Sequence, residues 1–212
     1  MISEWTKQQL SASLFKYMKL KSLDKISVKE LTDDCGFPRS TFYYHFEDIY
    51  DLASWALADR MVAWLKEGDG CVLWGEGLLH LFQHAQENRD ICQCAIDSSG
   101  LWRMADSYCE RCMQGIIPCI RKLDGDRHTD PGFLQYLATF YAHAILGALI
   151  KWLRSGMVQT PEEMAELIDL LVKDNMIATL DRANRQKSIF NLPESLPAPL
   201  AEPAKTKAAA TV

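Results

Sequence analysis

The chain has 212 residues, of which 48% are hydrophobic, and this is enough apolar surface to form one large buried core or two smaller ones. Its formal net charge of −5 at pH 7 excludes a uniformly basic surface, so any contact with nucleic acid must come from a local patch. The longest apolar run, residues 144–150, is too short to cross a bilayer, and the first residues lack the pattern of a signal peptide. Seven cysteines at irregular spacing are typical of a reducing compartment, so we expect a cytoplasmic protein without structural disulfides.

Two helices are predicted near the start of the chain from the spacing of their capping residues. Thr6 and Gln9 have capping-box spacing and an apolar face follows them, which predicts a first helix over about residues 6–21. Ser27 and Glu30 repeat this spacing, so a short second helix is expected to begin there. Each box supplies partners for backbone N–H groups that otherwise lack them at a helix start.

A glycine and a proline separate the second helix from a third. Gly36 is typical of a helix end, and Pro38 suits the first turn of the next helix because its missing N–H needs no partner there. The third helix is expected to reach about Phe46. Two short helices around a glycine turn form a helix-turn-helix over residues 27–46.

The rest of the chain has the apolar periodicity of longer helices. Acidic residues at positions 47, 48 and 51 favour the start of a fourth helix that reaches about residue 66. Thr160, Pro161 and Glu163 combine three signals for a helix start, whereas Pro118 predicts a kink or an end. The later helices are expected over residues 72–87, 89–96, 100–122, 133–154 and 161–183.

These elements predict an all-α fold with two structured parts and a tail. Residues 1–48 would form an N-terminal three-helix domain with a helix-turn-helix, and residues 49–190 a C-terminal helical domain. Residues 191–212 are rich in proline and alanine and poor in large apolar side chains, so we expect a disordered tail.

The segment from Ile26 to Phe46, and above all the run TFYYHF at its end, resembles the DNA-binding domain of TetR-family transcriptional regulators. A second similarity is to the ligand-binding and dimerisation domain of the TetR subgroup that includes activators of dihydroxyacetone-kinase operons. It rests on Gly147, Trp152, Gly156, Met157 and the run Pro161–Met164. The resemblance implies a homodimer that binds double-stranded operator DNA through its first domain. It also implies an unidentified small-molecule effector, bound by the second domain, that modulates DNA affinity.

In a helix-turn-helix, the N-terminal residues of the second helix face base edges in the major groove. Arg39 is the best candidate for reading a base, because its planar fork can donate to both acceptors of guanine, a contact worth about 1–3 kcal/mol of discrimination. The resemblance places Ser40 and Tyr44 beside bases as well. The candidates for phosphate contacts are Thr41, Tyr43 and His45 of the third helix, Ser27 and Lys29 of the second, and Lys16, Lys19 and Lys21 of the first.

Two features of this segment depart from the family pattern. The family usually carries a lysine where this chain has Ile49, and near relatives often carry a basic residue where it has Glu47. Residues 27–46 contain two cationic and three acidic side chains, a net charge of −1, which predicts weak nonspecific attraction to DNA. An alternative therefore stays open: a TetR-like ligand sensor or co-regulator that has lost DNA binding and acts through protein partners.

The C-terminal half supplies candidates for a dimer interface and an effector pocket. Dimerisation is expected through the helices near residues 133–154 and 161–183, whose apolar stripes could pair as a four-helix bundle or fill the core of each subunit. The interface candidates are Phe133, Leu137, Phe140, Tyr141, Ala144, Trp152, Leu167, Leu171 and Val172. Effector contacts could come from aromatic and polar residues, types that are also common in a helical core. They are Trp74, Phe82, His84, Trp102, Arg103, Tyr108 and His143.

No enzymatic activity, cofactor or metal is expected. The sequence contains no glycine-rich phosphate loop, nucleophile elbow or paired metal-ligand motif. Metal ligands could in principle come from the pairs Cys92 and Cys94, Cys109 and Cys112, and His80 and His84. Residues two positions apart lie on different sides of a helix, however, so Cys92 and Cys94 are not expected to share a metal.

Overall fold

The computed structural model describes residues 2–67 and 75–185, which form α-helices and two 3-10 turns, with no strand among them. This confirms the predicted all-α class. The helices are α1 (Ile2–Met18), α2 (Val28–Cys35), α3 (Arg39–His45), α4 (Ile49–Glu67), α5 (Glu76–Glu87), α6 (Arg89–Ile96), α7 (Leu101–Asp124), α8 (Pro131–Arg154) and α9 (Pro161–Arg185). The 3-10 turns are Leu23–Lys25 and Gly125–Arg127.

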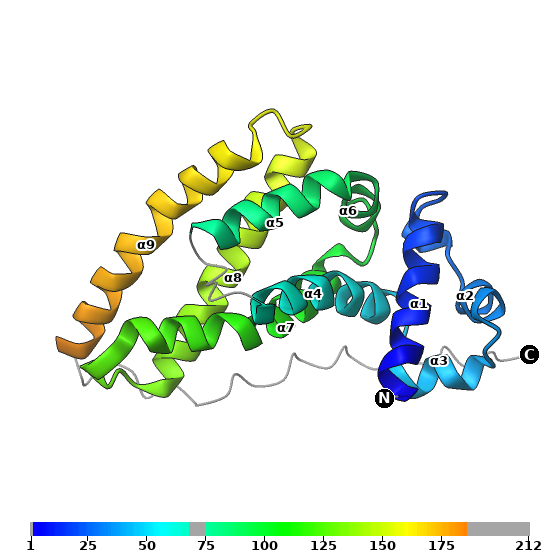
Figure 1. The fold of residues 1–212 in the computed structure, drawn as a ribbon, viewed down its shortest axis with the longest axis horizontal. Helices are drawn as coiled ribbons and strands as arrows, with labels where there is room; N and C mark the ends of the chain where they lie inside the picture. Colours follow the sequence, from blue (N-terminus) through cyan, green and yellow to red (C-terminus); the bar gives the residue numbers. More distant parts are fainter. Residues whose placement is uncertain (1, 68–74, 186–212) are drawn as a thin grey trace, which may run out of the picture.

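The described helices bury two hydrophobic clusters. The first, termed the head cluster below, joins α1, α2 and α3 to the beginning of α4 and to side chains of α6 and α7, and includes the fully buried Leu10, Leu31 and Phe42. The second is larger and joins α5, α7, α8 and α9. In Figure 1 the N-terminal helices lie at one end of the molecule, and α4 runs from them along α7 into the larger helical part. Residues 2–48 are termed the head below.

Three predicted helix boundaries are confirmed by hydrogen bonds or backbone angles. Ser27 and Glu30 form the expected capping box, in which the Glu30 N–H donates to Ser27 Oγ at 3.3 Å and the Ser27 N–H to Glu30 Oε2 at 2.9 Å. Gly36 ends α2 with a φ of +69°, in the left-handed region that favours glycine. At the start of α9, the Glu163 N–H donates to Thr160 Oγ1 at 3.2 Å.

The structure corrects the prediction for the start of α1, which begins at Ile2 rather than near Thr6. Thr6 is buried within the helix, so it is not the capping residue. Glu4 supports the earlier start because its carboxylate lies in the first turn, where the helix dipole favours negative charge. It also forms an ion pair with Lys7 at 2.9 Å, one turn along the same helix.

The structure places both prolines more exactly than the sequence did. Pro38 is the N-cap residue of α3, with a φ of −69°, so the helix begins one residue later than predicted, at Arg39. Helix α7 spans Leu101–Asp124, close to the predicted range of 100–122, so the helix does not end at Pro118. Pro118 and Gln114, whose carbonyl loses its usual N–H donor, are both exposed, so water can replace the missing hydrogen bond.

Of the described helices, one, α8, is long and apolar enough by length and composition alone to cross a membrane. In the fold it packs against α7 and contributes Trp152 and Leu153 to the larger cluster, as a core helix does. Helix α5 begins at Glu76. Its predicted first residues and the predicted tail over 191–212 lie outside the described residues.

Candidate nucleic-acid interface

Helix α3 is held in place by aromatic side chains on its inner face and at its ends. Phe42 is fully buried in the head cluster. Phe46, just after the helix, packs on Trp55 of α4 with ring centroids 5.7 Å apart. Phe37, in the turn before the helix, meets Trp5 of α1 at 5.8 Å. Close packing at both ends makes the outer face of α3 a rigid surface.

The outer face of α3 presents four side chains of the predicted site. Arg39 and Ser40 in the first turn are exposed, and Tyr43 and Tyr44 are 60% and 82% exposed. Positions four residues apart lie on the same side of a helix, so these side chains form one continuous surface. Arg39 makes no ion pair with a described residue, which leaves its guanidinium free to donate to a partner.

The other two candidates on α3 border this surface. Thr41 and His45 are partly buried, and the His45 ring meets the Tyr44 ring edge-on, with centroids 4.8 Å apart. The structure therefore brings together, on one short helix, all the residues that the sequence assigned to the third helix as DNA contacts.

Two lysines from the end of α1 and the turn after it pair with acidic side chains of α2. Lys16 Nζ lies 2.5 Å from Asp34 Oδ1, and Lys21 Nζ lies 2.5 Å from Glu30 Oε1. The hydrogen bond from Lys21, followed by those from Ser27, lowers the pKa of Glu30 from 4.5 to about 2. The hydrogen bond from Lys16 is the main cause of a lowered pKa for Asp34.

These ion pairs change the charge balance of the helix-turn-helix. Over residues 27–46, the charged side chains that pair with no described residue are Lys29, Arg39 and Asp33. Two cations against one carboxylate leave +1, in place of the −1 counted from the sequence. The sequence could not reveal this, because the paired residues are 9 and 18 positions apart and only the packing of α1 on α2 brings them together.

The remaining predicted phosphate contacts differ in whether their side chains already bind other residues of the chain. Lys29 is exposed, whereas Lys16 is engaged in its ion pair. The Ser27 hydroxyl donates to Glu30 Oε2 at 2.8 Å and accepts from the Glu30 N–H, so its proton is used within the capping box. Ile49 is partly buried against the head cluster, where it makes an apolar contact at the position that a lysine usually occupies in the family.

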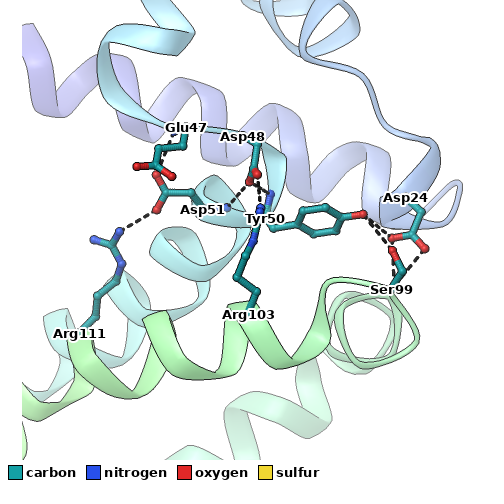
Figure 2. A network of polar contacts seen from close by, with 8 residues as sticks. All are labelled: Asp24, Glu47, Asp48, Tyr50, Asp51, Ser99, Arg103 and Arg111. Atoms are coloured by element: carbon teal, nitrogen blue, oxygen red, sulfur yellow. Dashed lines mark hydrogen bonds and ion pairs between the residues drawn. The ribbon is translucent and has the colours of Figure 1, made fainter. Parts of the chain in front are cut away.

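A polar network, shown in Figure 2, ties the start of α4 to α7. Asp48 Oδ1 accepts hydrogen bonds from the N–H groups of Tyr50 at 2.9 Å and Asp51 at 3.0 Å. The other oxygen of the Asp48 carboxylate pairs with Arg103, and Asp51 Oδ1 accepts from Arg111 at 2.9 Å. Because both arginines belong to α7, two ion pairs hold the beginning of α4 on that helix.

The same network joins the head to the turn between α6 and α7. The Tyr50 hydroxyl donates to Asp24 Oδ1 at 2.9 Å, and the Ser99 N–H donates to Asp24 Oδ2 at 3.0 Å. The hydrogen bond from Ser99 is the main cause of a lowered pKa for Asp24. A Cβ atom at Gly100 would overlap the Tyr50 ring, so glycine is needed there. The eight residues of Figure 2 are termed the junction below.

A cavity of about 90 Å³ lies where the two hydrophobic clusters meet. Its wall is formed by residues of α1, α4, α5, α6, α7 and α8. Of the predicted effector contacts, His84 and Tyr108 line it. The wall also includes Ser54 of α4, which sequence reasoning missed, although a serine within the apolar stretch 52–58 was a signal that could have found it.

The structure places the other predicted effector contacts away from this cavity. Phe82 is buried in the larger cluster, Trp102 is 76% exposed, and Arg103 belongs to the junction. His143 is exposed on α8, and Trp74 lies outside the described residues.

Large apolar side chains are exposed on both α8 and α9, and together they are termed the apolar surface of α8 and α9 below. They are between 49% and 75% exposed, and they are Tyr136, Phe140, Leu167, Leu170 and Leu171. Of the predicted interface residues, Phe140, Ala144, Leu167 and Leu171 are exposed, Phe133 is partly buried, and Leu137, Tyr141, Trp152 and Val172 are buried. The buried four fill the core of the subunit and cannot also face a partner.

Among the described residues, no group of three or more His, Cys, Asp or Glu side chains is arranged to hold a metal ion. The six described cysteines form no disulfide. Burial raises the pKa of Cys92 to about 11, and those of Cys109 and Cys112 to about 12. These thiols are therefore protonated, and weakly nucleophilic, at neutral pH.

Comparison with known proteins gives a family match and several solved structures of similar fold. Residues 73–174 match the TetR-type family described as "Transcriptional regulator C-terminal region". The dihydroxyacetone kinase operon activator DhaS is 18% identical over 84% of this chain and 97% of that chain, with a TM-score of 0.50. A transcriptional regulator from Pseudomonas aeruginosa PAO1 is 15% identical over 85% of this chain and 94% of that chain, with a TM-score of 0.52.

At these identities the two structures show a shared fold, and comparison with curated protein sequences gives no match. The family match covers α5 to α8 and the first part of α9, and the shared fold extends over most of the chain. The family match over residues 73–174 and the shared fold support a TetR-family transcriptional regulator.

Proposed function

We propose that this chain is a homodimeric regulator that binds operator DNA through the head, with an affinity that a small molecule bound in the larger helical part modulates. The division into a DNA-binding domain and a regulatory domain is part of this proposal. The observation that carries it is the outer face of α3, where Arg39, Ser40, Tyr43 and Tyr44 are exposed on a helix whose inner face is locked into the core.

The chemistry of this face suits the major groove. Arg39 can donate two parallel hydrogen bonds to N7 and O6 of guanine. The exposed ring of Tyr44 can contact a thymine methyl group, and the Tyr43 hydroxyl can donate to a phosphate oxygen. Lys29, exposed in the first turn of α2, adds a cation for the phosphate backbone.

A two-fold dimer is needed to place two such helices in successive major grooves, about 34–36 Å apart. We infer that the apolar surface of α8 and α9 is the interface, because its large side chains would otherwise face water. The double variant Phe140→Glu and Leu171→Glu is expected to be a folded monomer by analytical ultracentrifugation. Val158→Glu changes a residue that is 77% exposed outside this surface, and should stay dimeric.

A route from effector to DNA follows from the position of α4. This helix carries Tyr50 and Asp51 in the junction and, about one turn later, Ser54 at the cavity. A ligand that moves α4 would therefore also move the contacts that hold the head. Operator affinity changes if the ligand binds more tightly to one position of α4 than to another.

The test of DNA binding is a selection of duplexes by the full-length protein at low salt, followed by gel-shift titration of the selected operator. Arg39→Ala is expected to weaken binding by about 5- to 150-fold for each half-site contact, and to relax the preference at one base pair. Arg121→Ala removes an exposed arginine from α7 and should leave affinity unchanged. A uniform loss for all sequences would contradict base reading by Arg39.

Ile49 favours a second candidate, a ligand-sensing protein that acts through a protein partner. Its side chain makes an apolar contact with the head cluster, so this position supplies no cation for phosphate. This candidate predicts that the folded dimer selects no duplex even at low salt, and the same selection experiment therefore separates the two functions.

A further inference from the structure

We infer that the effector is a small, uncharged, largely apolar molecule with one hydrogen-bonding group, which binds in the cavity between the two hydrophobic clusters and contacts the Ser54 hydroxyl. This inference rests on the proposed function, because it names the ligand that would regulate DNA binding. Three observations support it: the apolar composition of the cavity wall, the unpaired hydroxyl of Ser54, and the helices that must move to admit a ligand.

The wall of the cavity excludes a charged ligand. None of the described residues that line it is Asp, Glu, Lys or Arg, and most are Leu, Ile, Ala, Met or Phe. A charged group in this environment would lose its hydration without gaining a charged partner. The cost of that burial exceeds what apolar contacts can offset.

Ser54 offers a hydrogen-bonding group that no described residue uses. Its side chain is fully buried, and its hydroxyl has no hydrogen-bond partner in the described part of the chain. Buried hydroxyl groups are nearly always paired, so a hydroxyl or carbonyl group of a ligand would satisfy this one. Other polar side chains of the wall are already engaged: His84 and Asn88 lie within 3.2 Å of each other, and Tyr108 shares a hydrogen bond with the Cys112 thiol.

The cavity volume limits the ligand to about one small ring. An engineered apolar cavity of about 150 Å³ is known to accept benzene. The cavity here measures about 90 Å³, so even a single ring requires small movements of the wall. Phe15 of α1 and Leu57 of α4 belong to this wall, and α1 is part of the head. Admission of a ligand is thereby linked to displacement of the DNA-binding end.

Phenol, toluene and benzoate form a matched series of probes, with the same ring carrying a hydroxyl, no hydrogen-bonding group, or a negative charge. Isothermal titration of the full-length protein without DNA is expected to show binding of phenol, weaker binding of toluene and none of benzoate. Ser54→Ala should weaken phenol binding by about 2- to 12-fold and leave toluene binding unchanged. Ser98→Ala, at a buried serine outside the cavity, should change neither.

A second variant tests the location independently of Ser54. Ala105→Leu adds a side chain to the α7 wall and is expected to abolish phenol binding, with helical content checked by circular dichroism. The inference is overturned if benzoate binds as tightly as phenol, if none of the probes binds, or if folded Ala105→Leu still binds phenol. Phenol binding that leaves operator affinity unchanged would support the ligand assignment and overturn the proposed regulation, so the two can fail separately.

Discussion

Ser54 and Ser98 are both buried serines, but their hydroxyl groups are in different situations. The Ser98 hydroxyl donates to the Ala95 carbonyl at 2.8 Å, whereas the Ser54 hydroxyl has no partner among the described residues. Removing a bonded hydroxyl loses a hydrogen bond, while removing an unpaired one relieves the cost of burying it. The same substitution should therefore have opposite effects at the two positions.

We predict that Ser54→Ala raises the free energy of unfolding of the ligand-free protein by about 1 kcal/mol, and that Ser98→Ala lowers it by about 1 kcal/mol. Urea denaturation followed by circular dichroism measures both changes. A loss of stability in Ser54→Ala would show that a partner in solution already satisfies this hydroxyl.

Glu30 of α2 forms an ion pair with Lys21, in the turn after α1, only while its carboxylate is charged. Its hydrogen bonds with Lys21 and Ser27 lower its pKa from 4.5 to about 2. A carboxyl group with a lowered pKa in the folded state stabilises the fold above its unfolded pKa, and this contribution disappears as the pH falls through the folded pKa. For Glu30 the window therefore runs from about 4.5 down to about 2.

The stability difference between the natural protein and Glu30→Gln is accordingly expected to be constant above this window and to shrink across it. Urea denaturation at a series of pH values measures the difference. Glu166→Gln, which removes one exposed carboxylate from α9, is the matched control. A difference that does not change between pH 4.5 and pH 2 would contradict the assigned ionic contact.

At the scale of helices, the starts of α2 and α9 were predictable from explicit capping signals: α2 begins at Val28, after the Ser27 cap, and α9 begins at Pro161. Helix α6 was expected over residues 89–96 from apolar periodicity alone, and it spans Arg89–Ile96. The predicted start of α1 was wrong because Thr6 and Gln9 have the spacing of a capping box but lie inside a helix that begins at Ile2. Local spacing alone does not separate a helix start from a later turn with the same residues.

The candidate site also has one part that the sequence predicted and other parts that it did not. The exposed face of α3 lies within seven residues, so its periodicity predicted which side chains share a surface. The junction and the cavity depend on packing between distant helices: Arg103 meets Asp48 across 55 positions, and the cavity wall comes from six helices. No short-range pattern specifies which faces of these helices meet, so only the three-dimensional structure could reveal them.

Gly100 is the residue in the turn between α6 and α7 that admits the Tyr50 ring. We predict that Gly100→Ala displaces this ring and loosens the junction, so that the Ser99 amide, which donates to Asp24, exchanges its hydrogen faster. Tyr50→Phe keeps the ring and removes only the hydroxyl contacts, and should have a smaller effect. Hydrogen exchange followed by NMR measures both. Unchanged protection of Ser99 in Gly100→Ala would show that the turn does not depend on this packing.

At the scale of the whole molecule, DNA binding is expected to depend only modestly on salt. Each head has two cations in the helix-turn-helix without a described acidic partner, Lys29 and Arg39. Four such cations in a dimer predict a slope of log K against log salt of about −4. Gel-shift titrations of the selected operator over a range of salt concentrations measure this slope.

Two variants of single lysines sharpen the salt test. Lys29→Ala is expected to reduce the magnitude of the slope by about 2 per dimer, since each subunit loses one phosphate contact. Lys16→Ala should leave it almost unchanged, because Lys16 is paired with Asp34. A slope near −10 for the natural protein would show that basic residues outside the helix-turn-helix dominate binding.

The pairing of Lys16 and Lys21 with acidic residues of α2 also has a consequence for how such a regulator would search a genome. A chromosome offers a very large excess of nonspecific sites, and strongly cationic proteins spend most of their time on them. A head in which Lys16 and Lys21 are already partnered would leave those sites more quickly, so fewer molecules would be sequestered on irrelevant sequence. A small number of copies per cell could then keep one operator occupied.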